Sequence, residues 1–133
     1  MSNTFRDFFP DRISQAQEEE RIISERLPAF RAKAIDETQA ALLRRSATKT
    51  QWIKGNPVKE IDAEGNMLAL IVACVTFPDL QDANLQEAWS VMGAEALVKK
   101  MLLPGEYALL SDWIAEINGF HDDLQSLVDQ AKN

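Results

Sequence analysis

Residues 93–107 read Gly-Ala-Glu-Ala-Leu-Val-Lys-Lys-Met-Leu-Leu-Pro-Gly-Glu-Tyr, and this stretch predicts two helices that meet at a tight joint. From Ala94 to Leu102, apolar side chains recur at the three- and four-residue spacing of one helical face. Because a proline disfavours helical geometry in the residue before it, the first helix is predicted to end near Leu102 or Leu103. Pro104 can then begin the second helix, since the N–H that it lacks has no partner in a first turn.

The second helix is predicted to continue to Asn118-Gly119, a pair suited to a left-handed C-cap. Its inward stripe follows the helical spacing and comprises Tyr107, Leu110, Ile114 and Ile117. Other large apolar side chains of the two helices lie off the regular inward stripes. We therefore expect exposed apolar surface, available to a protein partner, at Leu102, Leu103, Leu109 and Trp113. The alternative for each is burial against an N-terminal ribbon or a last helix.

The segment before this pair predicts a central helix. Residues 61–76 leave almost no polar face, which is typical of a helix buried on all sides, and Pro78 ends it. A short helix capped by Asp82 or Asn84 is then expected before Gly93. Beyond Gly119, residues 122–131 predict a final amphipathic helix.

The N-terminal half predicts the only strands. Residues 21–27 and 30–35 are expected to form a two-stranded ribbon around Pro28-Ala29, and Asp36 is a good N-cap for a helix ending near Thr48. Gly, Asn and Pro predict a loop over residues 50–58. Trp52, within this loop, is expected to cover the core, with a partner-binding anchor as the alternative.

Taken together, these elements predict a mainly α fold, a compact helical domain of about five to six helices with a small N-terminal β-ribbon. We expect a single domain over residues 1–133, comprising an N-terminal arm (1–17), the ribbon, first helix and loop (18–60) and a helical core (61–133). Three phenylalanines in the arm are costly to leave in water, so the arm is expected to dock on the body or on a partner. They are Phe5, Phe8 and Phe9.

The charge is distributed unevenly. The net charge is −7, yet residues 1–60 carry 11 Lys/Arg against 9 Asp/Glu, whereas residues 61–133 carry 3 against 12. An acidic half repels nucleic acid and acidic membranes, so neither is expected as a partner. No apolar run approaches the ~18 residues that span a bilayer, and the N-terminus lacks the apolar segment of a secretion signal. We therefore expect the protein in the cytoplasm.

The sequence offers no recognisable catalytic, metal or cofactor site. The glycines are isolated, with no phosphate-binding loop, and His121 has no identifiable nucleophile to serve. Cys74 is the only cysteine and is predicted to be an inert buried thiol. The short helices around Gly93 suggest a helix-turn-helix, but Lys99 and Lys100 alone provide too little positive charge for DNA. We therefore expect a non-enzymatic protein without metal or cofactor.

Several short segments, by their order and spacing around the apolar central helix, carry a resemblance to a known family. They are Ile61-Asp62, Pro78-Asp79-Leu80, Asp82–Gln86, Val91–Ala94, Met101–Tyr107 and Glu116–Phe120. They resemble the XkdN-like tail assembly chaperones of contractile-tailed phages and of related PBSX-like prophages in Gram-positive bacteria. The resemblance covers residues 61–120 and extends over 5–49, where Ala47 stands in place of an expected cysteine.

The resemblance implies a chaperone that binds the long, helical tape measure protein. Such proteins keep the tape measure protein soluble in the bacterial host cytoplasm and leave as the tail tube polymerises around it. A longer form made by ribosomal frameshifting and self-association remain open as further partners. Two alternatives also remain: a structural tail or connector subunit, and a small helical regulatory protein that binds a host factor.

Overall fold

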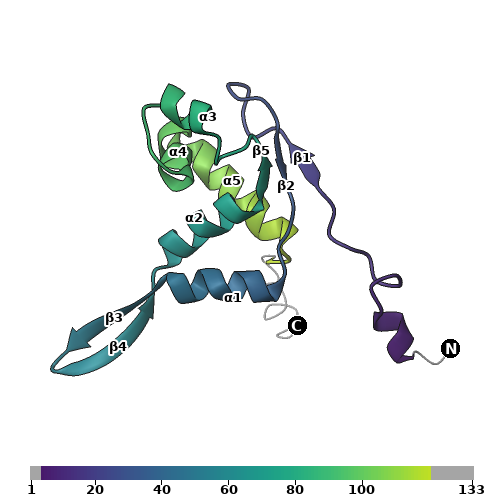
Figure 1. The fold of residues 1–133 in the computed structure, drawn as a ribbon, viewed down its shortest axis with the longest axis horizontal. Helices are drawn as coiled ribbons and strands as arrows, with labels where there is room; N and C mark the ends of the chain where they lie inside the picture. The colour runs from purple at the N-terminus through teal and green to yellow at the C-terminus, as the bar shows by residue number, and fades with distance from the viewer. Residues whose placement is uncertain (1–3, 121–133) are drawn as a thin grey trace, which may run out of the picture.

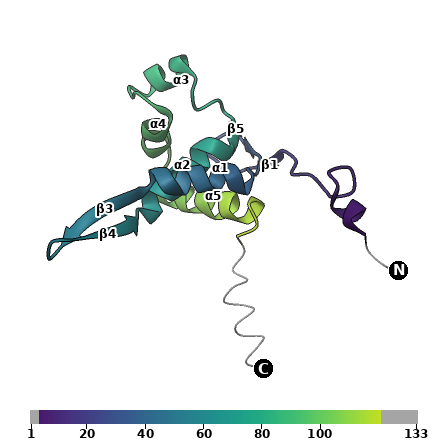
Figure 2. The ribbon, with the colours of Figure 1, turned by 60° about the horizontal axis from the view of Figure 1, so that its bottom comes forward.

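The computed structural model describes residues 4–120. Its elements follow in the order η1 (Phe5–Phe8, a 3-10 helix), β1 (Glu19–Arg21), β2 (Phe30–Ala32), α1 (Glu37–Ser46), β3 (Thr48–Ile53), β4 (Asn56–Ile61), α2 (Ala63–Cys74), β5 (Val75–Phe77), α3 (Ala83–Ala88), α4 (Ala94–Met101) and α5 (Pro104–Ile117). Helices α2, α4 and α5 form the centre, while the β3–β4 hairpin and the N-terminal arm project from it in different directions (Figures 1 and 2).

The fold is mixed α/β, and the expectation of a mainly α domain with one small ribbon is wrong. The described residues contain five strands in two antiparallel sheets, with strand orders β1-β2-β5 and β3-β4. The predicted N-terminal ribbon therefore exists as two strands of a three-stranded sheet. Its first strand is Glu19–Arg21, however, so the expected strand over residues 21–27 is wrong beyond Arg21. Two strand-forming segments were missed, one treated as a loop and the other as the end of a helix.

The first missed segment is the hairpin over residues 48–61. Its strands pair from Thr48 with Ile61 to Ile53 with Asn56. Lys54 and Gly55 form the connection at φ values of 54° and 81°, and two consecutive positive φ angles suit a tight hairpin turn. Proline is tolerated in a two-stranded ribbon because each strand has an outer edge whose N–H groups need no partner, so Pro57 does not prevent pairing.

The second missed segment is β5. The central helix was expected to continue through Thr76, but α2 ends at Cys74. Val75, Thr76 and Phe77 are β-branched or aromatic residues, which favour strands, and β5 pairs with β2. The apolar run is continuous from helix to strand, so hydrophobicity alone does not mark the change.

The core lies between α2, α4, α5 and the three-stranded sheet. Its fully buried members come from all of these elements and include Ala32, Ile71, Cys74, Leu97, Val98, Leu110, Trp113 and Ile114. Helix α2 is not buried on all sides, because Ala73 is exposed and Met67, Ala69 and Val72 are half-buried. Helices α1, α4 and α5 pack against α2, and the exposed side chain of Ala73 marks the part of its surface that they leave in solvent.

The predictions for the C-terminal helices are confirmed. Asp82 caps α3, Gly93 precedes α4, and Pro104 opens α5. Asn118 is the C-cap of α5, and Gly119 has a φ of 85°. Asp36 caps α1 as expected. The expected final helix and His121 lie outside the described residues, and no helix within residues 4–120 is long and apolar enough to cross a membrane.

Candidate partner-binding surface

A polar clamp fixes the joint between α4 and α5. Glu106 is buried and accepts hydrogen bonds from Ser24 Oγ (2.6 Å), Arg26 Nε (3.1 Å) and the backbone N of Leu103 (2.7 Å). Arg26 also forms an ion pair with Glu106 and donates to the carbonyl of Met101 at 2.8 Å. These contacts, with the Arg26 hydrogen bond foremost, lower the pKa of Glu106 to about 2. The segment after β1 is thereby held against the joint.

The two leucines of the joint, Leu102 and Leu103, differ in exposure. Leu102 turns into the core as the chain leaves α4, so the expectation that it is exposed is wrong. Leu103 caps α5 through its backbone, and its side chain is 56% exposed. Leu103 therefore exposes apolar surface, and the hydrogen bond from its backbone N to Glu106 holds it in place.

The two candidates within α5 also differ. Trp113 is only 1% exposed, and the guanidinium of Arg21 lies 5.6 Å from its ring centroid. Arg21 also pairs with Glu116 at 3.4 Å, so the end of β1 covers this side of α5. The expectation that Trp113 is exposed is therefore wrong. Leu109 is 55% exposed.

Ile22 is an exposed apolar residue that the sequence did not single out. It follows Arg21, which contacts Trp113 and Glu116, and precedes Ser24, which contacts Glu106. The segment therefore runs along α5 past the turn that carries Leu109. The side chain of Ile22 is 71% exposed.

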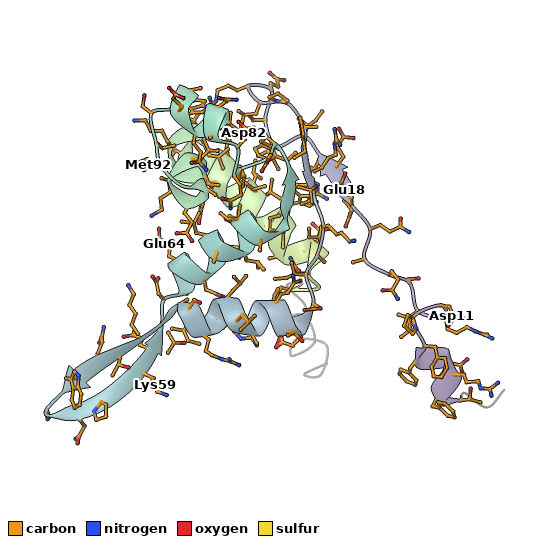
Figure 3. All side chains as sticks on the ribbon, in the orientation of Figure 1. Asp11, Glu18, Lys59, Glu64, Asp82 and Met92 are labelled. Atoms are coloured by element: carbon orange, nitrogen blue, oxygen red, sulfur yellow. The ribbon has the colours of Figure 1, made fainter. Side chains whose placement is uncertain are left out.

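The hairpin carries the remaining candidate. Trp52 lies beside the turn, opposite Pro57, and is 71% exposed. It does not cover the core, because the hairpin projects from the body and its side chains stand away from the helices, as Lys59 shows (Figure 3). Ile53, Val58 and Ile61 of the same hairpin are also exposed. The position of Trp52 agrees with the alternative that it serves as a partner-binding anchor.

An apolar pocket was also missed from the sequence. Its volume is about 160 Å³, and it lies between the β1–β2 turn, the end of β5, α3 and the end of α4. Its lining consists of Leu27, Pro28, Ala29, Phe30, Phe77, Pro78, Leu85 and Met101. Four separate segments contribute these residues, so no local pattern could have revealed it.

The N-terminal arm leaves its phenylalanines in solvent. Phe5 and Phe8 are about three-quarters exposed, and Phe9 is almost half exposed. The rings of Phe5 and Phe9 lie 5.7 Å apart. The arm projects away from the helices (Figures 1 and 3). The arm was expected to dock on the body or on a partner, and in this structure its described part does not pack on the body.

A family model described as "Phage XkdN-like tail assembly chaperone protein" matches residues 5–132. The chain belongs to this family. It is 30% identical to the phage-like element PBSX protein XkdN of Bacillus subtilis and 32% identical to the uncharacterized protein YqbN of the same bacterium. Each alignment covers 95% of this chain and 91% of the relative. A crystal structure of the protein YqbN matches 91% of this chain and all of its own, with a TM-score of 0.76 and 25% identity.

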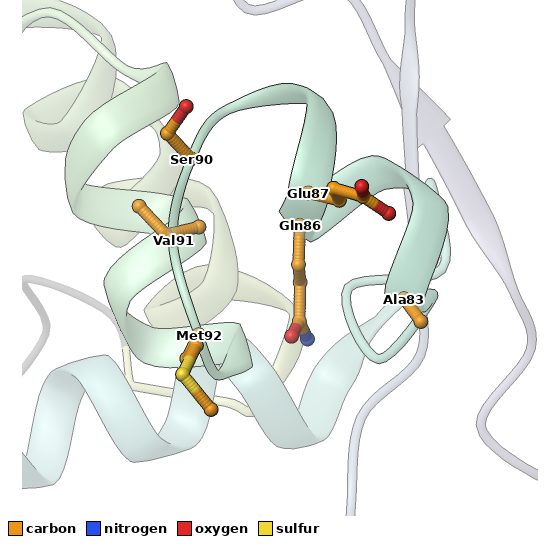
Figure 4. A pocket seen from close by; sticks show the side chains of 6 residues that line it. All are labelled: Ala83, Gln86, Glu87, Ser90, Val91 and Met92. Carbon is orange, nitrogen blue, oxygen red and sulfur yellow. The ribbon is translucent and has the colours of Figure 1, made fainter.

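Another hollow of this XkdN-like chaperone lies between α3 and the loop that follows it. The open recess of about 480 Å³ is lined by Ala83, Gln86, Glu87, Ser90, Val91 and Met92 (Figure 4). The Gln86 amide is engaged structurally, because it donates to the Leu80 carbonyl and accepts from the Gly93 N–H, both at 2.9 Å. Met92 is 94% exposed at its rim. The recess offers a contact surface and no group activated for chemistry.

The single cysteine of this XkdN-like chaperone lies inside the fold. Cys74 is fully buried, as predicted, and burial raises the pKa of its thiol. Asn118 Nδ2 donates to its sulfur at 3.4 Å. Residues 4–120 contain no group of three or more His, Cys, Asp or Glu side chains placed to hold a metal ion.

Proposed function

We propose that this tail assembly chaperone binds the tape measure protein and keeps it soluble in the host cytoplasm until the tail tube polymerises around it. Family membership supports the chaperone role. The observation that supports client binding is the apolar surface left in solvent at Leu103, the N-cap of α5, at Leu109 on α5 and at Trp52 on the hairpin.

This apolar exposure is more than scattered surface hydrophobicity. Isolated apolar side chains on a surface need no explanation. Here polar contacts hold the backbone next to two of the exposed apolar side chains. The Glu106 clamp fixes the cap at Leu103, and the ion pair of Arg21 with Glu116 fixes the segment that carries Ile22. An amphipathic client helix is bound through such apolar anchors, and each one buried contributes roughly 1.5–3 kcal/mol.

Co-expression tests this proposal. The tape measure protein encoded nearby is produced with the wild-type chain, with the variant Leu103→Asp/Leu109→Asp/Trp52→Ala, or alone. We expect the soluble fraction to be high with wild type and low in the other two cultures. Leu42→Asp is the matched control, because Leu42 is 53% exposed on α1, away from α5. Equal solubility with wild type and the triple variant, if that variant is folded, would argue against this surface.

A structural tail subunit is the second candidate. Two elements, the arm and the hairpin, project from the body with exposed apolar side chains (Figure 2), and such projections are suited to contacts between neighbouring subunits. A structural subunit should form rings or tubes without the tape measure protein. Light scattering on the purified chain separates the two, since a chaperone stays small and a structural subunit forms large assemblies.

A further inference from the structure

The apolar pocket has the size of one aromatic ring. Its volume of about 160 Å³ is close to that of a ~150 Å³ engineered apolar cavity that stays dry and binds benzene. All eight lining residues are apolar, so the pocket offers no partner for a polar ligand. A phenylalanine side chain matches it in both size and chemistry.

The pocket walls are held in place by contacts behind them. Phe30 and Met101 belong to the core. Arg26 donates to the Met101 carbonyl, and the guanidinium of Arg31 lies 4.6 Å from the ring centroid of Phe77. The site is therefore formed before a ligand arrives, which reduces the entropic cost of binding.

The chain itself carries a suitable ligand. The arm presents Phe5 and Phe8 to solvent, and among the described residues its hydrogen bonds, from Thr4 to Gln15, stay within the arm. The first side chain that ties this end of the chain to the sheet is Glu18, which accepts from Thr76 Oγ1 at 2.8 Å and pairs with Arg31.

We propose that this pocket binds a phenylalanine side chain from the N-terminal arm of a second copy of the chain. The arm leaves the sheet at the end of β1 away from the β1–β2 turn that lines the pocket, and it points away from its own body (Figures 1 and 2). Two arginines and two aspartates leave residues 1–17 uncharged overall, so the arm can approach a body of net charge −7 without repulsion.

Reciprocal exchange of arms fills both pockets and closes a twofold dimer. The contact is small compared with the roughly 1,200–2,000 Å² of a stable interface, so the dimer is weak and depends on concentration. This inference does not depend on client binding: loss of the dimer leaves the co-expression result unchanged.

Sedimentation velocity on the full chain over a concentration series tests the proposal. We expect a monomer–dimer equilibrium whose Kd rises roughly tenfold or more when Phe5, Phe8 and Phe9 are all replaced by alanine. Ala29→Phe fills the pocket with its own ring and should weaken the dimer similarly. Ile13→Ala in the arm and Ala108→Phe on an exposed part of α5 are the controls and should leave the Kd unchanged. A monomer at all concentrations, or a dimer indifferent to both substitutions, would overturn the proposal.

A peptide titration needs no substitution in the pocket. A synthetic peptide of residues 4–13 is added to the full chain carrying the three Phe→Ala changes, and the methyl NMR signals of Leu27, Leu85 and Met101 are followed. We expect saturable shifts, and none with a peptide carrying the same three changes. If the peptide causes no shifts, the pocket is not the site of the arm. The same conclusion holds if the tape measure protein shifts these signals and the peptide does not. Wild-type shifts that depend on the arm but not on concentration place the arm in its own pocket and refute exchange.

Discussion

Trp113→Ala and Trp52→Ala should have very different effects on the free energy of unfolding, although both remove an indole. Trp113 is 1% exposed in the core, beneath Arg21. Truncating a buried Phe or Trp costs about 3–5 kcal/mol through lost transfer energy and the cavity left behind. Against a typical total of roughly 5–15 kcal/mol, this loss lowers the melting temperature by roughly 10–18 °C for a chain of this length. Trp52→Ala should cost less than about 1 kcal/mol, because only cross-strand contacts are lost.

Urea denaturation followed by far-UV circular dichroism measures both values, since that signal comes mainly from the backbone. Trp113→Phe is the matched control and should recover a large part of the loss. A cost below about 1 kcal/mol for Trp113→Ala would refute the burial of this side chain. A cost above about 3 kcal/mol for Trp52→Ala would mean that the hairpin tip packs on the body. The same pair separates stability from client binding, because only Trp52→Ala should weaken binding in a fully folded protein.

Two further perturbations follow from the polar contacts of α5. The pKa of Glu106 is lowered from 4.5 to about 2, so its clamp stabilises the fold at pH above 4.5, and this contribution is lost as the pH falls from 4.5 towards 2. Glu106→Gln should flatten the pH dependence of the urea midpoint in that window, and an unchanged profile would contradict the clamp. Asn118 accepts from Ile35 N (3.1 Å) and donates to the Ile114 carbonyl (2.7 Å). Asn118→Ala should cost about 1–3 kcal/mol in urea denaturation, whereas Asn84→Ala on exposed α3 should cost far less; equal costs would refute the role of Asn118.

Local signals in the sequence predicted the helical half well. Gly93, Pro104 and the Asn118-Gly119 pair each act within one turn of chain, through backbone geometry that tertiary contacts seldom override. The same holds for the N-caps Asp36 and Asp82. These residues therefore fixed the bounds of α1, α3, α4 and α5 to within a few positions.

The β structure depended on pairing that the sequence does not display. β5 is recognisable only once β2 lies beside it, because its residues continue the apolar run of α2. In the hairpin, Gly55 and Pro57 were treated as signs of a loop, although Lys54-Gly55 forms a tight turn and Pro57 lies in a two-stranded ribbon. The hairpin can be predicted only when turn chemistry and strand propensity are considered together.

The candidate site shows the same limit at the level of single residues. A stripe at helical spacing placed Trp113 outside the buried face of α5, but the segment from Arg21 to Arg26 covers that side as well. This segment lies more than 80 residues away in sequence, and Glu106 holds it through Ser24. Leu103 and Leu109 remain exposed because no segment within residues 4–120 covers them in this way.

We propose that this chaperone holds the tape measure protein through its exposed apolar elements. Affinity purification of the tagged chain from cells that co-express the tape measure protein, followed by hydrogen exchange on the purified complex and on the free chain, tests it most directly. We expect the two proteins to elute together and hydrogen exchange to slow at the start of α5 and in the β3–β4 hairpin. Elution of the chain alone, or a complex in which exchange at both elements is unchanged, would contradict it.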